Sequence, residues 1–132
     1  MTATPLSMRE AQALLDHVLE AADGPITVAI CDAAGDLVLL HRDDGAAGFT
    51  ADIASGKAYT AARFANSTSV LEQLWSERPV YAHSLVAQGK WFVGRGGVPV
   101  LADGLVRGAI GVSGSDPHVE EQIAEAAVAA IS

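Results

Sequence analysis

The sequence predicts an α+β fold in which helices cover a five-stranded antiparallel sheet. Apolar residues recur at helical spacing near both ends of the chain and in one central segment. Between them lie short runs rich in β-branched residues, two of which are joined by Ala102-Asp103-Gly104, a hairpin signal. The chain has 132 residues, half of them apolar, which suits one core. We therefore expect a single domain over residues 1–132 with the order α-β-β-α-(α)-β-β-β-α.

The first helix and hairpin are predicted from local signals. Ser7 and Glu10 have the spacing of a capping box, and an apolar stripe at helical spacing follows them as far as residue 22. Residues 26–31 and 37–42 are two strand-like runs separated by a turn, and they predict the first hairpin. His17 lies at the edge of the helical stripe, where it is either a boundary residue or a ligand that faces a pocket between subunits.

The central helix, over residues 50–65, departs from a simple amphipathic pattern. Steps of 100° place Lys57 on one stripe with Ile53, Thr60 and Phe64. A lysine among such neighbours must extend its charge to the edge, pair with a carboxylate or bound anion, or lose its proton. Structural pairing and a role in ligand contact or catalysis are both open at this point.

Small residues form the neighbouring flank of the same helix: Ala54, Ser55, Ala58 and Ala62. Such a flank allows a second helix to come close, and contact between subunits is one predicted use for it.

The next segment is the least regular in the chain. Ser69 and Glu72 predict a second capping box and a short helix that Pro79 ends. Residues 78–90 show no clear period and predict an ordered loop over the sheet. Tyr81 and His83 are its candidates for ligand contact, although both could instead hydrogen-bond the loop to itself.

The C-terminal half contains three predicted strands and a last helix. Trp91 begins the first strand, and 98–101 with 105–112 form the hairpin around Asp103-Gly104. Pro117 begins the helix, whose acidic residues lie outside its apolar stripe. These acidic residues are Glu120, Glu121 and Glu125.

Charge and composition exclude several classes of protein. The formal net charge is −8 and only eight residues are Lys or Arg, which argues against binding to nucleic acid or to an anionic membrane. No apolar run approaches the length of a membrane-spanning helix, and the start lacks the pattern of an export signal, so we expect a cytoplasmic protein. The single cysteine, Cys31, is expected to be a buried hydrophobic residue.

Four motifs, in this order and spacing, resemble the GlcG/HbpS family, which includes the C-terminal domain of PduO-type corrinoid adenosyltransferases. The resemblance covers nearly the whole chain and implies a profilin-like fold, a homo-oligomer such as a dimer, tetramer or octamer, and ligand pockets near subunit interfaces. Members with assigned roles bind haem, and some degrade it. The motifs are Asp32-Ala-Ala-Gly-Asp-Leu-Val, Gly56-Lys-Ala-Tyr-Thr-Ala, Gly96-Gly-Val-Pro-Val and Gly108-Ala-Ile-Gly-Val-Ser-Gly.

The resemblance suggests a haem or tetrapyrrole site. Lys57 and Thr60 match the family's Lys-Ala-x-Thr-Ala segment. Gly97 matches its Gly-Gly-x-Pro segment, of which Gly96 is the first residue. The threonine that contacts iron in secreted members is absent from residues 79–83, so the axial ligand would have to be another residue. The candidates are Tyr81, His83 and His17, with Lys57 or Arg95 pairing a propionate.

The alternative is a cofactor-independent enzyme with isomerase- or lyase-type chemistry on a small organic substrate at a subunit interface. Lys57 would be its acid-base or anion-binding group, and Tyr81 or His83 its proton shuttle. Ser113 and the backbone amides of Gly96 and Gly97 would stabilise a developing oxyanion. A purely structural oligomeric module is the third possibility.

Overall fold

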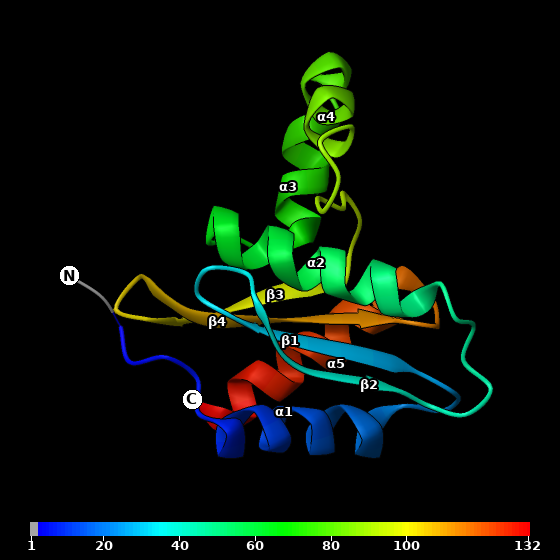
Figure 1. Ribbon diagram of the computed structural model, residues 1–132, viewed down its shortest axis with the longest axis vertical. Coiled ribbons are helices and arrows are strands. Elements are labelled where there is room, and N and C mark those ends of the chain that lie inside the picture. The colour runs from blue at the N-terminus through cyan, green and yellow to red at the C-terminus, as the bar shows by residue number, and fades with distance from the viewer. Residues whose placement is uncertain (1–2) are drawn as a thin grey trace.

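A computed structural model describes residues 3–132 and confirms the α+β class. Within these residues a four-stranded antiparallel sheet, in the order β2-β1-β4-β3, lies between α1 and α5 on one face and α2 on the other, while α3 and α4 project from the α2 side (Figure 1). The helices are α1 (Met8–Ala21), α2 (Thr50–Phe64), α3 (Thr68–Trp75), α4 (Pro79–Val86) and α5 (Pro117–Ile131). The strands are β1 (Thr27–Asp32), β2 (Leu37–Arg42), β3 (Gly97–Ala102) and β4 (Leu105–Ser113).

Both predicted hairpins and the first helix start are confirmed. Asp103 and Gly104 have φ values of 52° and 78°, as the two central residues of a type I′ turn require. At the start of α1, the Glu10 amide donates to Ser7 Oγ at 3.1 Å and the Ser7 amide donates to Glu10 Oε1 at 3.1 Å. Local sequence signals were sufficient here because each of these contacts joins residues close in the chain.

The predicted fifth strand is wrong, because residues 91–93 form an irregular link instead. The Trp91 ring meets Tyr59 edge-on at 4.8 Å, and the Phe92 amide donates to Thr60 Oγ1 at 2.9 Å. Side chains therefore hold this segment against α2, and β3 is the edge strand of the sheet.

The region before this link also differs from the prediction. Residues 79–86 form α4 and not a loop, because Pro79 is well suited to the first turn of a helix. The second capping box is wrong as well: α3 begins at Thr68, after Ser67, with no side-chain cap. Thr68 is buried, and its Oγ1 accepts a hydrogen bond from the Gly97 amide at 2.9 Å.

The small flank of α2 packs on the sheet of its own chain. Ala54, Ala58 and Ala62 are buried together with Ala29 and Ala109, and only Ser55 is partly exposed. The expectation that this flank contacts another subunit is therefore wrong. Its small side chains instead let the α2 backbone approach the sheet closely.

No helix within residues 3–132 is both long enough and apolar enough to span a membrane.

Candidate functional site

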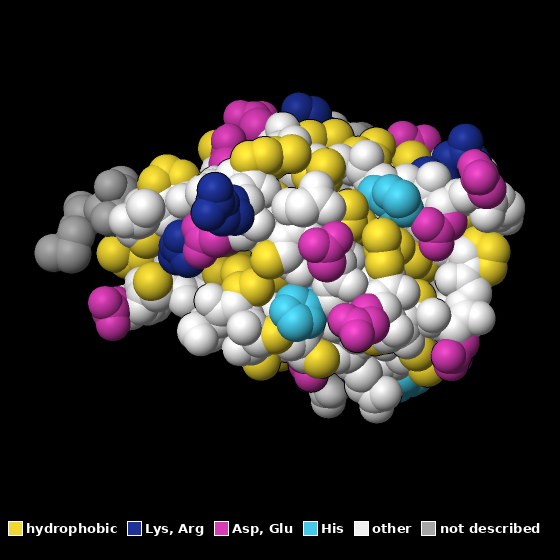
Figure 2. Space-filling model, turned by 90° about the horizontal axis from the view of Figure 1, so that it is seen from below, with side chains coloured by type: hydrophobic (Ala, Val, Ile, Leu, Met, Phe, Trp, Pro, Cys, Tyr) yellow, Lys and Arg dark blue, Asp and Glu magenta, His cyan; other side chains and the backbone are white. Residues whose placement is uncertain are grey.

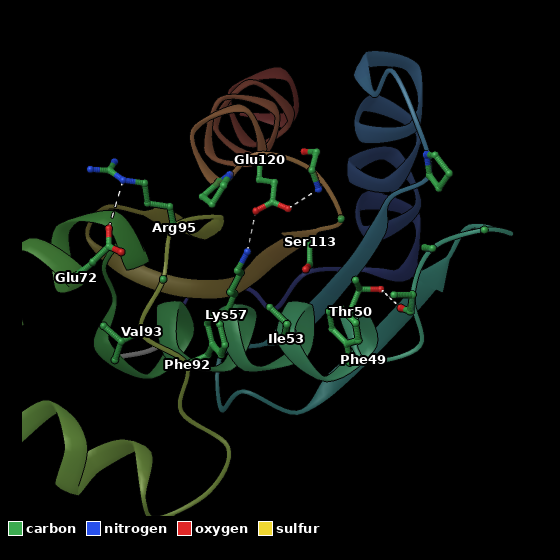
Figure 3. Close-up of a pocket in the computed structure, with 18 residues that line it drawn as sticks. Phe49, Thr50, Ile53, Lys57, Glu72, Phe92, Val93, Arg95, Ser113 and Glu120 are labelled. Atoms are coloured by element: carbon green, nitrogen blue, oxygen red, sulfur yellow. Dashed lines mark hydrogen bonds and ion pairs between the residues drawn. The ribbon is translucent and has the colours of Figure 1, made fainter.

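A pocket of about 640 Å³ lies where β4 ends, between the first halves of α2 and α5 (Figure 3). The segment before β3, Glu72 of α3, Pro25 and residues 45–47 of the loop before α2 complete its wall. Elements distant in the sequence thus converge on one site. Its polar lining includes Thr50, Lys57, Glu72, Arg95, Ser113, Ser115 and Glu120, and its apolar lining includes Phe49, Ile53, Phe92 and Val93.

Lys57 lines this pocket but is held in an ion pair. Lys57 is only 4% exposed, and its Nζ donates to the Val112 carbonyl at 2.9 Å and to Glu120 Oε1 at 3.0 Å. Glu120 Oε2 accepts from the Ser115 amide at 2.8 Å, so both carboxylate oxygens have partners. Among the roles that the sequence left open for Lys57, pairing with a carboxylate is the one that the structure shows. The pair joins α2 to the start of α5 and the end of β4.

Glu120 is the residue that the sequence prediction misplaced. It was expected outside the apolar stripe of the last helix, but it is 2% exposed. A buried charge is tolerated only with a partner and with its other hydrogen bonds made, and Lys57 supplies the partner. A lysine predicted to be buried was the signal that an acidic residue elsewhere had to face it.

The Lys57 ammonium retains one donor beyond its two hydrogen bonds, because an ammonium has three. Its Nζ lies 5.9 Å from the centroid of the Phe92 ring, which also lines the pocket. The remaining donor is therefore available at the pocket wall.

Ser113 ends β4 beside Lys57. The residue is 5% exposed and lines the pocket, and its hydroxyl makes no hydrogen bond to any atom of residues 3–132. Figure 3 shows this hydroxyl between Lys57 and Thr50. Thr50 Oγ1, by contrast, is paired with Thr27 Oγ1 at 2.8 Å. Ser113 therefore presents an uncommitted hydroxyl to the pocket.

Arg95 lies at the edge of the pocket between two carboxylates. Its Nε is 3.3 Å from Glu72 Oε2, and its Nη1 donates to Glu121 Oε2 at 2.8 Å. The two carboxylates balance the positive charge of this guanidinium, so Arg95 does not attract an anionic ligand.

Thr60, Gly96 and Gly97 do not line the pocket, but they contact residues next to it. Thr60 Oγ1 accepts from the Phe92 amide, and the Gly97 amide donates to Thr68 Oγ1, so this amide is not free to stabilise an oxyanion. Gly96 has a φ of 117°, and a Cβ there would lie 2.7 Å from the Val112 carbonyl and 3.0 Å from Lys57 Nζ. The absence of a side chain at Gly96 lets Lys57 reach Val112.

The other predicted site residues lie elsewhere. Tyr81 and His83 are exposed on α4, where the Tyr81 ring centroid is 5.7 Å from that of Trp75. His17 is exposed on α1 and lines a hollow of about 230 Å³ with Ile123 of α5. The structure therefore brings together Lys57, Ser113 and Arg95, but not the two predicted proton shuttles.

The pocket beside Lys57 offers haem iron none of its usual axial ligands, since its lining within residues 3–132 contains no His, Cys, Met or Tyr. Residues 3–132 also contain no cluster of three or more His, Cys, Asp or Glu that could hold a metal ion. Cys31 is buried as predicted, and burial raises the pKa of its thiol to about 12, so it is not a nucleophile at neutral pH.

The fold and the site define a small α+β domain with a pocket built around a buried ion pair. The sequence profile of the family described as haem-degrading protein HbpS-like matches residues 6–129, and the chain belongs to this family.

Two related sequences and two solved structures place the chain among its relatives. An uncharacterised 15.0 kDa protein of Citrobacter freundii is 32% identical over 79% of this chain and 74% of its own length. The corrinoid adenosyltransferase PduO of the same organism is 30% identical over 82% of this chain, which spans only 32% of that enzyme. An HbpS double mutant from Streptomyces reticuli has a TM-score of 0.89 and 29% identity, covering 100% of this chain and 90% of that one. A PduOC–haem complex has a TM-score of 0.86 and 28% identity, covering 96% and 95%.

Proposed function

We propose that this protein binds haem or a related tetrapyrrole, with His17 as the axial ligand. The family and the haem complex of a similar domain support the class of ligand. The choice of His17 rests on one observation: its exposed imidazole borders an apolar hollow between α1 and α5. A neutral imidazole is a competent iron ligand.

The residues around His17 suit one flat face of a macrocycle. The apolar part of the hollow is formed by Ile123 and by the small side chains of Ala126 and Ala127, over which a planar group can lie closely. Figure 2 shows the face of the molecule on which α1 lies, with histidine side chains exposed among hydrophobic and acidic ones. Glu20 is the charged residue of the hollow, so propionate groups would point away from it into solvent.

A second copy of the chain is the expected partner. A hollow of about 230 Å³ covers only part of a tetrapyrrole, so another surface would have to cover the rest. The projecting helices α3 and α4 also expose large apolar side chains: Leu74 is 58% exposed and Val80 79%. We propose a homo-oligomer that buries these surfaces.

The alternative of acid-base catalysis in the pocket has weaker support. Lys57 is held by two partners, and neither Tyr81 nor His83 lines the pocket. Tyr81 or His83 could act as the proton shuttle in this pocket only if α4 of another subunit placed it there.

Titration of the apo-protein with haemin tests the proposal. We expect a protein-specific Soret band in the wild type, His83→Ala and Tyr81→Phe, and a band lost or shifted in His17→Ala. Light scattering on the same samples should give a mass above the 13.6 kDa of one chain. No Soret band in the wild type would reject haem binding, and a band lost in His83→Ala or Tyr81→Phe but kept in His17→Ala would move the site to α4.

A further inference from the structure

The Ser113 hydroxyl lies at the wall of the pocket and makes no hydrogen bond to an atom of residues 3–132. Within residues 3–132 no side-chain nitrogen or oxygen is both sealed from solvent and without a hydrogen bond, so this oxygen is accessible from the pocket. Ser113 is 5% exposed at the inner wall of the pocket, and its oxygen has no partner among residues 3–132. The pocket is the direction from which a partner can come (Figure 3).

The neighbouring Lys57 supplies a second donor in the same place. Two of its three N–H groups are used by Val112 and Glu120, which leaves one for the pocket. A hydroxyl and an ammonium donor side by side suit one oxygen that accepts two hydrogen bonds, such as a carbonyl oxygen.

The charges around the pocket argue against an anionic ligand. Lys57 is already neutralised by Glu120, and Arg95 lies between Glu72 and Glu121. Three carboxylates therefore stand against two cations in these pairs, in a chain whose formal net charge is −8. A carboxylate ligand would meet a net negative surrounding, whereas an uncharged oxygen would not.

The rest of the pocket wall is apolar and partly aromatic. Phe49, the residue that precedes α2, is 65% exposed. Ile53 lies one turn further along, and Phe92 lines the same pocket from the segment before β3. An exposed phenylalanine beside a pocket offers contact area to an apolar ligand, since burial of each aromatic side chain removes a large apolar surface from water.

We propose that this pocket binds a neutral carbonyl compound with an aromatic or other apolar group. The carbonyl oxygen accepts hydrogen bonds from Ser113 Oγ and Lys57 Nζ, and the apolar group contacts Phe49, Ile53 and Phe92. This site is distinct from the proposed haem site at His17 and does not depend on it.

Three probes of similar size test the ligand class by NMR titration of the ¹⁵N-labelled protein: acetophenone, benzoate and ethylbenzene. We expect acetophenone to shift the amide resonances of Gly114 and Ser115 and to bind more tightly than the other two. Tighter binding of benzoate would overturn the proposal by showing an anion site. Equal binding of ethylbenzene would overturn it by showing that the oxygen contributes nothing.

The substitution Ser113→Ala tests the residue assignment, with Ser84→Ala on α4 as a matched control outside the pocket. Loss of one hydrogen bond should weaken acetophenone binding by about 2- to 12-fold and leave ethylbenzene binding unchanged. The control should bind both probes like the wild type. Unchanged acetophenone affinity in Ser113→Ala would overturn the assignment whatever the result with haemin.

Discussion

The two faces of the sheet are packed differently. On the side of α1 and α5, branched side chains such as Leu14, Val28 and Ile110 fill the core. On the side of α2, Ala54 and Ala58 lie against Gly111 with almost no side-chain volume between them. The first arrangement stabilises the fold by burial of apolar area. The second brings the α2 backbone close to the sheet, and close approach is what places Lys57 within reach of β4 and α5. The candidate pocket therefore depends on the side of the core that has the smaller side chains.

Two ion pairs also differ between these regions, in how far they are buried. Arg107 of β4 donates two hydrogen bonds to Glu10 of α1, at 2.9 and 2.7 Å, and both side chains are partly exposed. The pair of Lys57 and Glu120 is almost fully buried. A partly exposed pair is expected to add little to stability, while removal of one partner of a buried pair leaves a charge without compensation.

The largest expected effect comes from Gly111→Ala, which adds volume on the α2 side. A Cβ at this position would fall on the Ala54 carbonyl and lie 2.7 Å from the Ala58 amide nitrogen, so α2 would have to move away from the sheet. We expect a loss of more than about 5 kcal/mol in the free energy of unfolding, or no folding, measured by urea denaturation. The control Gly48→Ala, with no atom within 4 Å of the added Cβ, should change it by less than about 1 kcal/mol. A Gly111→Ala protein as stable as the control would contradict the close packing of α2.

The next effect is that of Lys57→Met, which leaves Glu120 buried without its cation. We expect a loss of about 3 to 5 kcal/mol in the free energy of unfolding. The double variant Lys57→Met with Glu120→Leu removes both charges and should recover most of that loss. If the single variant were as stable as the wild type, the ion pair would not hold the start of α5 in place.

The smallest effect is the pH dependence of the partly exposed pair. Hydrogen bonds from Arg107, and next from the Ser7 amide, lower the pKa of Glu10 from 4.5 to about 2. A carboxyl group with a lowered pKa in the folded state contributes stability that is complete above about pH 4.5 and is lost as the pH falls towards 2.

The substitution Arg107→Gln tests this pair. We expect it to reduce the loss of stability between pH 5 and pH 2.5, measured by urea denaturation at several pH values, because Glu10 then has a more ordinary pKa. Arg9→Gln, at an exposed position of α1, serves as a control for removal of a positive surface charge. An identical pH profile in Arg107→Gln and the wild type would show that the pair does not contribute.

The sequence by itself determined the elements whose signals are local. The capping box at Ser7, the Asp103-Gly104 turn and the start of the last helix at Pro117 each depend on residues a few positions apart, and all three are confirmed. The burial of Lys57 was also predictable, because its position on the helical stripe follows from the period of the helix.

Only the tertiary structure decided which residues meet across the chain. Glu120 lies 63 positions from Lys57. The helical period places Glu120 on the same stripe as Ile123, Ala124 and Ala127, but it does not say which residue of another element the carboxylate meets. The link at Trp91 was predicted as a strand because its residue types favour strands, but its side chains pack on α2 and leave its backbone without a strand partner. The small residues of α2 suggested an interface, and only the fold showed that the surface they approach is the sheet of the same chain, since small side chains permit close packing without specifying against what.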